Sequence, residues 1–205
     1  MSITWAHNYT VQCICNGRVH GYYALLIPLI LFWNVVYSQS SFPQHGLRCS
    51  DAITICEPVF ITNFSTDSTW LLEALPNLGC LSAVRTTGLS NRVNGAWYRI
   101  IVYQRGDLGF GIQPLTRNKT LDATVNLDWV LFRVTDTTGC GRLAEPIRCN
   151  FAQQGGLTGA IDSEQPSAQY EEPIRNVNIG DTFLLLVLNP DNHPFGYMID
   201  MGFSS

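Results

Sequence analysis

Short apolar runs bounded by turn residues make up most of the chain after about residue 50. Such runs are typical of β-strands, because a helix needs apolar positions spaced by three and four residues over a longer stretch. The pattern predicts seven strands, at residues 59–64, 97–104, 108–112, 127–134, 175–179, 182–188 and 196–201. Helical signals are limited to a turn at Ser68–Leu75, and the polar stretch Gln153–Gln169 predicts the longest exposed loop.

Two glycine-containing turns predict how some of these strands are connected. Arg105-Gly106-Asp107 separates strands 97–104 and 108–112 and predicts a tight hairpin, and Gly180-Asp181 joins strands 175–179 and 182–188. Strands without a long helix predict an all-β fold, namely an antiparallel β-sandwich of about seven to nine strands. No internal repeat, linker or second domain interrupts the pattern, so residues 39–205 are predicted to form one domain.

The first 38 residues have a different character. Residues 21–33 are uncharged and almost wholly apolar, Arg18 and His20 precede them, and Ser38 offers a small residue before a cleavage point. This pattern predicts a secretory signal peptide, with residues 1–38 as leader and signal and with the true start codon near Val19. A membrane anchor is the alternative that we do not favour, because the apolar run is shorter than a spanning helix and contains Pro28.

Composition and cysteine content narrow the class of protein. The 205 residues are 46% hydrophobic and 14% charged, which excludes disorder, and a formal net charge of −4 with a single lysine argues against nucleic-acid binding. Five cysteines follow residue 38, at spacings that fit no zinc ribbon or redox pair. In an exported protein they predict disulfides. We favour Cys49 with Cys56 and Cys140 with Cys149, which leaves Cys80 unpaired or as an alternative partner.

Several residues are candidates for binding chemistry. Trp97, Tyr98 and Trp129 lie in apolar strands and predict core rings, whereas Trp70 lies in a polar stretch and is the best candidate for stacking on a sugar. Oxygen ligands for Ca²⁺ are available from Asp122, Asn126 and Asp128. We favour the alternative that Asp122 and Asn126 shape the turn before the strand while Asp128 hydrogen-bonds a loop backbone, because the D-x-D-x-D-G spacing is absent.

Two further motifs have a simpler explanation. Arg105-Gly106-Asp107 spells the tripeptide that integrins bind, but a glycine between polar residues is also what a hairpin needs, and we favour the turn. Asn63 and Asn118 begin acceptor sequences for glycosylation, a pattern that is common by chance.

No catalytic constellation is apparent. The only histidines after residue 38, His45 and His193, lie in no metalloprotease motif, and adjacent Glu171 and Glu172 would point to opposite sides of an extended chain. Asp162 or Glu164 remains available as a distant acidic partner. The chain is therefore predicted to have no enzymatic activity and no obligatory cofactor, with Ca²⁺ as the one optional ion.

Several short motifs follow one another along the chain, namely Cys49–Cys56, Leu78–Leu81, Trp97-Tyr98, Gly106–Ile112, Asp128–Phe132, Cys149-Asn150, Gly156–Gly159, Ile179–Leu186 and Gly196–Gly202. Taken in this order, they resemble the β-sandwich modules of gliding-motility-associated and other type IX-secreted surface proteins of Bacteroidetes. These modules are similar to the pre-peptidase C-terminal domain, so the resemblance implies a jelly-roll-like sandwich in a secreted protein. Those modules usually have an aspartate two residues before Asp128, where this chain has Asn126. The sorting domain that usually ends such proteins has no counterpart in these motifs, which predicts either a free-standing module or a truncated gene.

Three functions follow from these observations. The first is a secreted cell-surface module for adhesion or for binding an extracellular ligand or glycan, with Gln153–Gln169 and Asn189–Phe195 as the binding face and Asp162 and Asn192 among its residues. The second is a structural subunit of an extracellular filament, in which copies of the chain pair at sheet edges and Gln39–Arg48 serves as a docking arm. The third is an accessory domain of a secreted hydrolase. None of them includes a nucleic-acid partner or a membrane span after signal cleavage.

Overall fold

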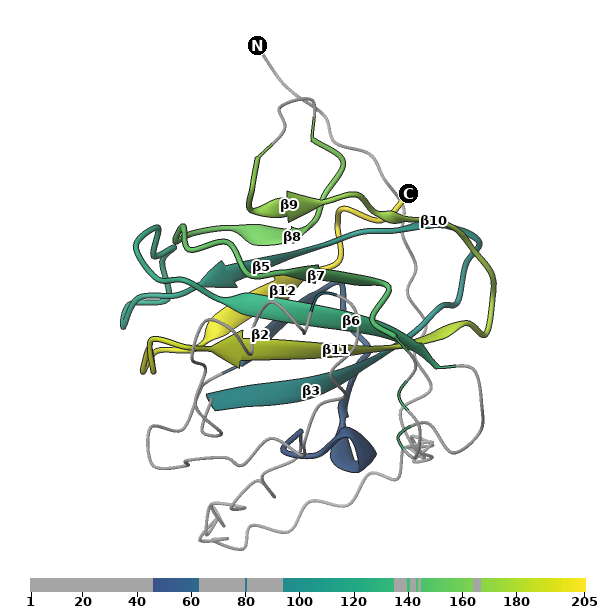
Figure 1. Ribbon diagram of the computed structural model, residues 1–205, viewed down its shortest axis with the longest axis horizontal. Coiled ribbons are helices and arrows are strands. Elements are labelled where there is room, and N and C mark those ends of the chain that lie inside the picture. The colour runs from purple at the N-terminus through teal and green to yellow at the C-terminus, as the bar shows by residue number, and fades with distance from the viewer. Residues whose placement is uncertain are drawn as a thin grey trace, which may run out of the picture.

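Two five-stranded sheets packed face to face form the body of the protein, a sandwich that confirms the predicted all-β class (Figure 1). This computed structural model describes residues 46–62, 80, 94–134, 140, 143, 145–163 and 167–205. The predicted signal peptide, the turn at 68–75, Trp70, His45, Asn63 and Glu164 lie outside these residues. Within the described ranges, no helix is long and apolar enough to cross a membrane.

The first sheet has the strand order β1-β3-β11-β6-β7. Its central strand β11 pairs antiparallel with β3 and β6 along nearly its whole length, whereas the edge strand β1 runs parallel to β3. A short 3-10 helix, η1 (Cys49–Asp51), precedes β1. The strands are β1 (Ile53–Ile55), β3 (Asn94–Ile101), β6 (Asp128–Val134), β7 (Arg148–Asn150) and β11 (Thr182–Asn189).

The second sheet has the strand order β2-β12-β5-β8-β9 and a parallel pair, β8 with β9, at its other edge. A separate two-stranded pair, β4 with β10, lies beside it. The strands are β2 (Val59–Thr62), β5 (Phe110–Pro114), β8 (Thr158–Ala160), β9 (Tyr170–Glu171), β12 (Tyr197–Asp200), β4 (Gly106–Leu108) and β10 (Ile174–Val177). The described residues thus contain twelve strands rather than seven to nine, and the edges of the two sheets are not wholly antiparallel.

All seven predicted strands are present, but the predicted hairpin is wrong. Residues 97–104 and 108–112 do not pair, because β3 belongs to the first sheet and β5 to the second. The Arg105-Gly106-Asp107 segment leads into β4, which pairs with β10 instead. The predicted connection across Gly180-Asp181 is confirmed, because these residues lie between β10 and β11, although the two strands belong to different sheets. Five short strands were missed, among them β8, which lies within the predicted loop 153–169.

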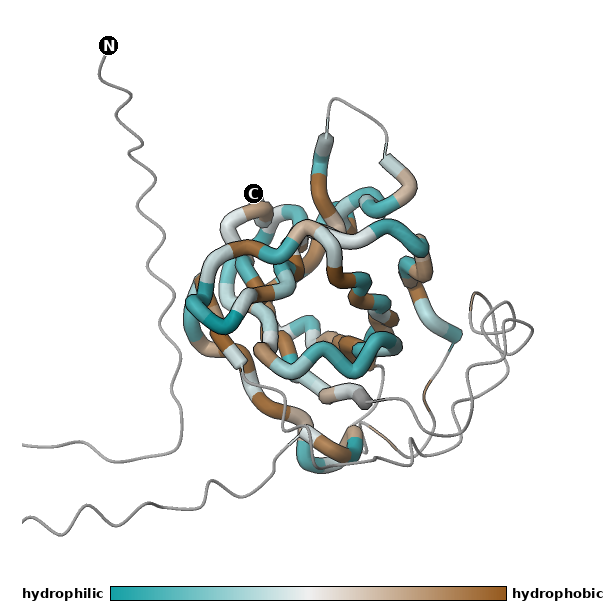
Figure 2. Tube along the Cα trace, turned by 90° about the vertical axis from the view of Figure 1, so that its left-hand side faces the viewer, coloured by the Kyte–Doolittle hydropathy of each residue, from teal (hydrophilic) through white to brown (hydrophobic). Residues whose placement is uncertain are grey.

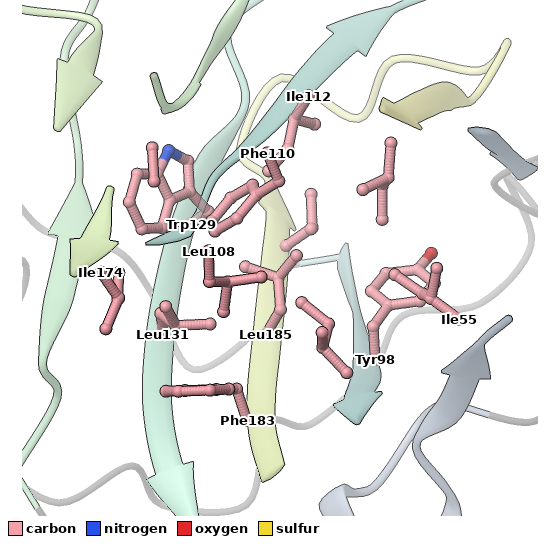
Figure 3. Packing of buried hydrophobic residues seen from close by; sticks show 14 of the residues in the cluster. Ile55, Tyr98, Leu108, Phe110, Ile112, Trp129, Leu131, Ile174, Phe183 and Leu185 are labelled. Carbon is pink, nitrogen blue, oxygen red and sulfur yellow. The ribbon is translucent and has the colours of Figure 1, made fainter. Parts of the chain in front are cut away.

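The inner core fills the space between the two sheets. Trp129, Phe110 and Tyr98 are fully buried there, and the rings of Phe110 and Trp129 meet edge to face with centroids 5.0 Å apart (Figure 3). The Tyr98 hydroxyl of the first sheet and the Tyr197 hydroxyl of the second share a hydrogen bond of 2.5 Å. Burial raises the pKa of Tyr98 to about 12, because the phenolate would lose its hydration. The predicted core rings Tyr98 and Trp129 are therefore confirmed.

An outer core covers the opposite face of the first sheet. Strand β11 is buried on both faces, so Phe183 and Leu185 point into the inner core while Leu184 and Leu186 point into the outer core. A strand that is covered on both faces has a continuous run of apolar residues in its sequence, as Thr182–Asn189 has. The third predicted core ring, Trp97, belongs to this layer. Its buried residues are Cys49, Trp97, Val130, Phe132, Leu184, Leu186 and Leu188.

Disulfides hold the segments that form the outer core. Cys49 in η1 is bonded to Cys140 in the β6–β7 connection, and Cys80 in the β2–β3 connection is bonded to Cys149 in β7, with Cα atoms 5.7 and 6.4 Å apart. Cys56 is also disulfide-bonded. The favoured pairing of Cys49 with Cys56 and of Cys140 with Cys149 is wrong, because the sheet topology brings together cysteines that are remote in sequence.

Candidate functional site

The sandwich has two ends with different chemistry. At the loop end, on the left in Figure 1, the connections 115–127, 151–157 and 189–196 meet, and Figure 2 looks onto this end. At the opposite end, which we call the pocket end, the chain crosses between the sheets at 55–58 and 101–109, and a pocket of about 240 Å³ opens there. The site residues predicted from the sequence are divided between these two ends.

Apolar side chains form the floor of the pocket, and two crossover segments form its walls. Ile55, Val102 and Val177 are buried members of the inner core, so the pocket reaches the space between the sheets. One wall is Cys56–Pro58, which leads from β1 to β2, and the other is Tyr103–Arg105, which leads from β3 to β4. An apolar concavity with a few polar groups at its rim is the usual form of a ligand site.

The C-terminal tail forms the remaining side of the pocket. Asp107 of β4 donates its backbone N–H to the Ser205 carbonyl at 2.5 Å and accepts the Ser205 N–H at 3.0 Å. The Ser204 hydroxyl donates to the Gly109 carbonyl at 2.8 Å. The tail therefore lies against β4 like an added strand.

Glycine is required where the tail approaches β4 and β5. A Cβ atom at Gly106 would overlap the Ser205 carbonyl, and one at Gly111 would lie 2.6 Å from the Phe203 ring. The sequence shows these glycines, but only the fold shows that the tail occupies the space above them.

Gly106→Ala is expected to displace the tail and to lower the free energy of unfolding by about 1–3 kcal/mol, because the new methyl group has no room beside a backbone carbonyl. The matched control is Gly180→Ala, which also has positive φ, at 89°, but has no atom within 4 Å of the added Cβ, so it costs only about 1 kcal/mol of backbone strain. Hydrogen exchange should show loss of protection at Asp107 and Ser205 in the first variant alone. Unchanged protection at both amides would contradict this docking of the tail.

The Asp107 carboxylate is bound by two residues of β10. Arg175 of β10 binds Asp107 at 2.7 Å and Asp162 at 2.9 Å, and the Asn176 N–H donates to Asp107 at 2.9 Å. The hydrogen bond from Arg175, followed by that from Asn176, lowers the pKa of Asp107. The Arg105-Gly106-Asp107 sequence is thus not the tip of a hairpin, and its aspartate is not free. Asp162 is the second carboxylate that binds Arg175. Nothing in the sequence pattern pointed to Arg175.

At the loop end, the predicted binding face is only partly assembled. Gly156 donates its N–H to the Val125 carbonyl, and Asn126 donates its N–H to Asp191, so the segments 153–157 and 189–195 flank the same loop. Asn192 is exposed there, with positive φ of 53°. Asp162, however, lies at the pocket end, so Asp162 and Asn192 do not share one face. His193 is buried and bonds the Leu115 carbonyl through Nε2 at 2.7 Å, which holds the turn.

The three proposed calcium ligands form hydrogen bonds with residues close to them in the sequence. Asp122 accepts hydrogen bonds from both the N–H and the hydroxyl of Thr124, at 3.0 and 2.6 Å, and so shapes its turn. Asn126 donates from Nδ2 to the buried carboxylate of Asp128 at 3.1 Å. Across the described part of the chain, no three His, Cys, Asp or Glu side chains are grouped so as to hold a metal ion. The Asp122 turn agrees with the favoured alternative, whereas Asp128 accepts from the Asn126 side chain instead of a loop backbone.

Asp128→Asn is expected to stabilise the protein by about 1–3 kcal/mol at pH 7. Burial raises the pKa of Asp128 from 3.8 to about 6; the hydrogen bond from Asn126 offsets part of this rise, and the nearby Asp191 makes a smaller contribution in the raising direction. A raised carboxyl pKa means that the folded protein is most stable below about pH 4 and loses this stability as the pH rises to about 6. The variant should lose this pH dependence, as measured by urea unfolding between pH 4 and 7.

The control for this experiment is Asp122→Asn at the same end of the sandwich. Hydrogen bonds from Thr124 lower the pKa of Asp122, so its charged form favours folding. The control should therefore be destabilised above about pH 4, the opposite sign. Equal responses of the two variants would refute the assignment of a buried, unfavourable charge to Asp128.

The comparisons with known proteins found no match to a protein-family model, a curated protein or a solved structure. The resemblance to gliding-motility-associated modules therefore stays a prediction, and the function is argued from the sites of this chain alone.

Proposed function

We propose that this protein is an extracellular module that binds a ligand without chemically changing it, and that the pocket end is its binding site. The observation that carries the proposal is the apolar pocket of about 240 Å³ at the junction of the two sheets. A stable strand framework with irregular segments around a concavity is the common arrangement for binding, because the framework fixes the geometry of the segments.

The cysteines support the extracellular part of this proposal. Two disulfides, Cys49–Cys140 and Cys80–Cys149, join segments of the sandwich, and disulfides persist in oxidising compartments but are rare in the cytosol. The predicted signal peptide at residues 1–38 fits the same location. In that compartment, binding of a ligand on a cell surface or matrix would mediate adhesion.

The proposal is tested by thermal unfolding of the full chain in the presence of a panel of peptides, oligosaccharides and small amphiphiles. A ligand at a concentration about 100 times its dissociation constant stabilises by about 2.7 kcal/mol, which raises the melting temperature by several degrees. Gln104→Trp, which places a bulky ring on an exposed wall of the pocket, should abolish this shift.

Leu121→Trp is the matched control, because Leu121 is 58% exposed at the loop end. If Leu121→Trp removes the shift and Gln104→Trp keeps it, the binding site is at the loop end. Turnover of any compound in the panel would contradict binding without catalysis.

A second candidate function, a filament subunit, is favoured by strand β2. It is the outermost described strand of its sheet, it carries no charge, and Val59 and Ile61 are 41% and 55% exposed. Charged residues usually protect such an edge from pairing with other chains. Sedimentation velocity at increasing concentration separates the two functions, because a filament subunit would form a ladder of species and a binding module would stay monomeric.

A further inference from the structure

We propose that the pocket binds an extended peptide segment and takes up one of its apolar side chains between the two sheets. This inference rests on the proposed function of the same pocket and names the class of its ligand.

The depth and lining of the pocket fit an apolar side chain. Its floor is formed by Ile55, Val102 and Val177, which are 6%, 7% and 4% exposed and belong to the inner core. A side chain that reaches this floor would leave water for an environment like the protein interior. Burial of a single large aliphatic or aromatic side chain strengthens binding by about 10- to 100-fold, enough to act as an anchor.

The walls of the pocket offer backbone groups to a ligand. Glu57 and Gln104 are exposed and lie on the two different crossover segments, outside any strand. Within the described residues, the backbone N–H and C=O groups of these two have no hydrogen-bond partner. Open backbone groups around an apolar floor are suited to a peptide, whose own amides can pair with them.

The tail of the chain shows that extended backbone is accepted at this position. Ser205 forms two backbone hydrogen bonds with Asp107, and Gly106 has no side chain that would hold the two segments apart. Both Gly106 and Ser205 line the pocket. A peptide in the pocket would therefore lie beside a segment that is already paired as a strand.

The charges at the rim are available to the residues that flank the anchor. Glu57 and Arg105 lie on the two different crossover segments that line the pocket, and neither takes part in an ion pair within the described ranges. Asp107, by contrast, is paired with Arg175. Glu57 and Arg105 are therefore open to a basic and an acidic residue that flank the anchor.

A glycan fits these features less well. Sugars bind through aromatic rings and planar polar side chains, and among the described residues that line the pocket Tyr103, which is 43% exposed, is the one aromatic side chain. The apolar floor would face sugar hydroxyls and leave them without partners.

The test pans the immobilised full chain with a phage library of random heptapeptides and measures the enriched peptides by fluorescence polarisation. They should share one apolar residue, and its replacement by alanine should weaken binding about tenfold or more. N-methylation of the amides beside that residue should weaken binding to a similar degree, because it removes backbone donors and keeps the side chains. Gln104→Trp should abolish binding, and Leu121→Trp, at an exposed position of the loop end, should preserve it.

Three results would overturn the proposal: no enriched peptide, enriched peptides that bind Gln104→Trp as well as the wild type, or affinity that N-methylation leaves unchanged. A glycan array and the amphiphile panel are run on the same variants. If a sugar or an amphiphile binds and Gln104→Trp removes it, the pocket is a binding site and only the peptide assignment fails. If Gln104→Trp weakens the binding of no probe, both the peptide assignment and the proposed function fail.

Discussion

Replacing Cys49 and Cys140 together by serine is expected to lower the free energy of unfolding by about 4 kcal/mol. The disulfide joins residues 91 positions apart, so its loss frees a long loop in the unfolded chain. It also releases η1 from the outer core, where the Cys49 side chain is buried against the first sheet. The change is measured as the shift in the urea midpoint at constant slope.

The matched variant replaces Cys80 and Cys149, whose disulfide joins residues 69 positions apart and should contribute a similar amount. Non-reducing peptide mapping of the wild type should recover the two linked pairs Cys49–Cys140 and Cys80–Cys149. Recovery of Cys140 linked to Cys149 would contradict this connectivity, and so would a Cys49/Cys140 variant as stable as the wild type.

Trp129→Ala is expected to destabilise the protein by about 3–5 kcal/mol, because it opens a large cavity in the inner core. Trp129 is fully buried, packs edge to face on Phe110, and donates from Nε1 to the Thr158 hydroxyl at 3.0 Å. Thr158 in turn donates to the Gln169 carbonyl at 2.7 Å, so the indole supports the β8–β9 edge of the second sheet. Thermal unfolding should show a melting temperature lower by roughly 6–20 °C.

Two further variants separate the contribution of ring packing to stability from that of the hydrogen bond. Trp129→Phe keeps most of the apolar contact and loses the bond to Thr158, so it should cost about 1–2 kcal/mol. Leu121→Ala, at an exposed position, should change stability by less than about 0.5 kcal/mol. If Trp129→Phe is as destabilising as Trp129→Ala, the hydrogen bond and not the packing is the main contribution of this side chain.

The pattern of apolar residues determined the class of fold and the position of the long strands. The continuous run Thr182–Leu188 and the run beginning at Leu127 were assigned correctly, because burial on one or both faces leaves a local signature in the sequence. Short strands such as β7 and β8 have no such signature in the sequence, because three residues are too few to show a periodic pattern. The burial of Trp129 could also be predicted, because its neighbours along the strand are apolar.

Only the tertiary structure decided which segments meet. The partner of Cys49, the ion pair between Arg175 and Asp107, and the pocket between two crossover segments all join residues that lie far apart in the chain. Sequence spacing predicted a hairpin at Arg105-Gly106-Asp107, but the apolar faces on either side of this segment are buried in different sheets. Local sequence limits the conformation of each segment, whereas contacts between remote segments depend on how all the apolar faces are buried together.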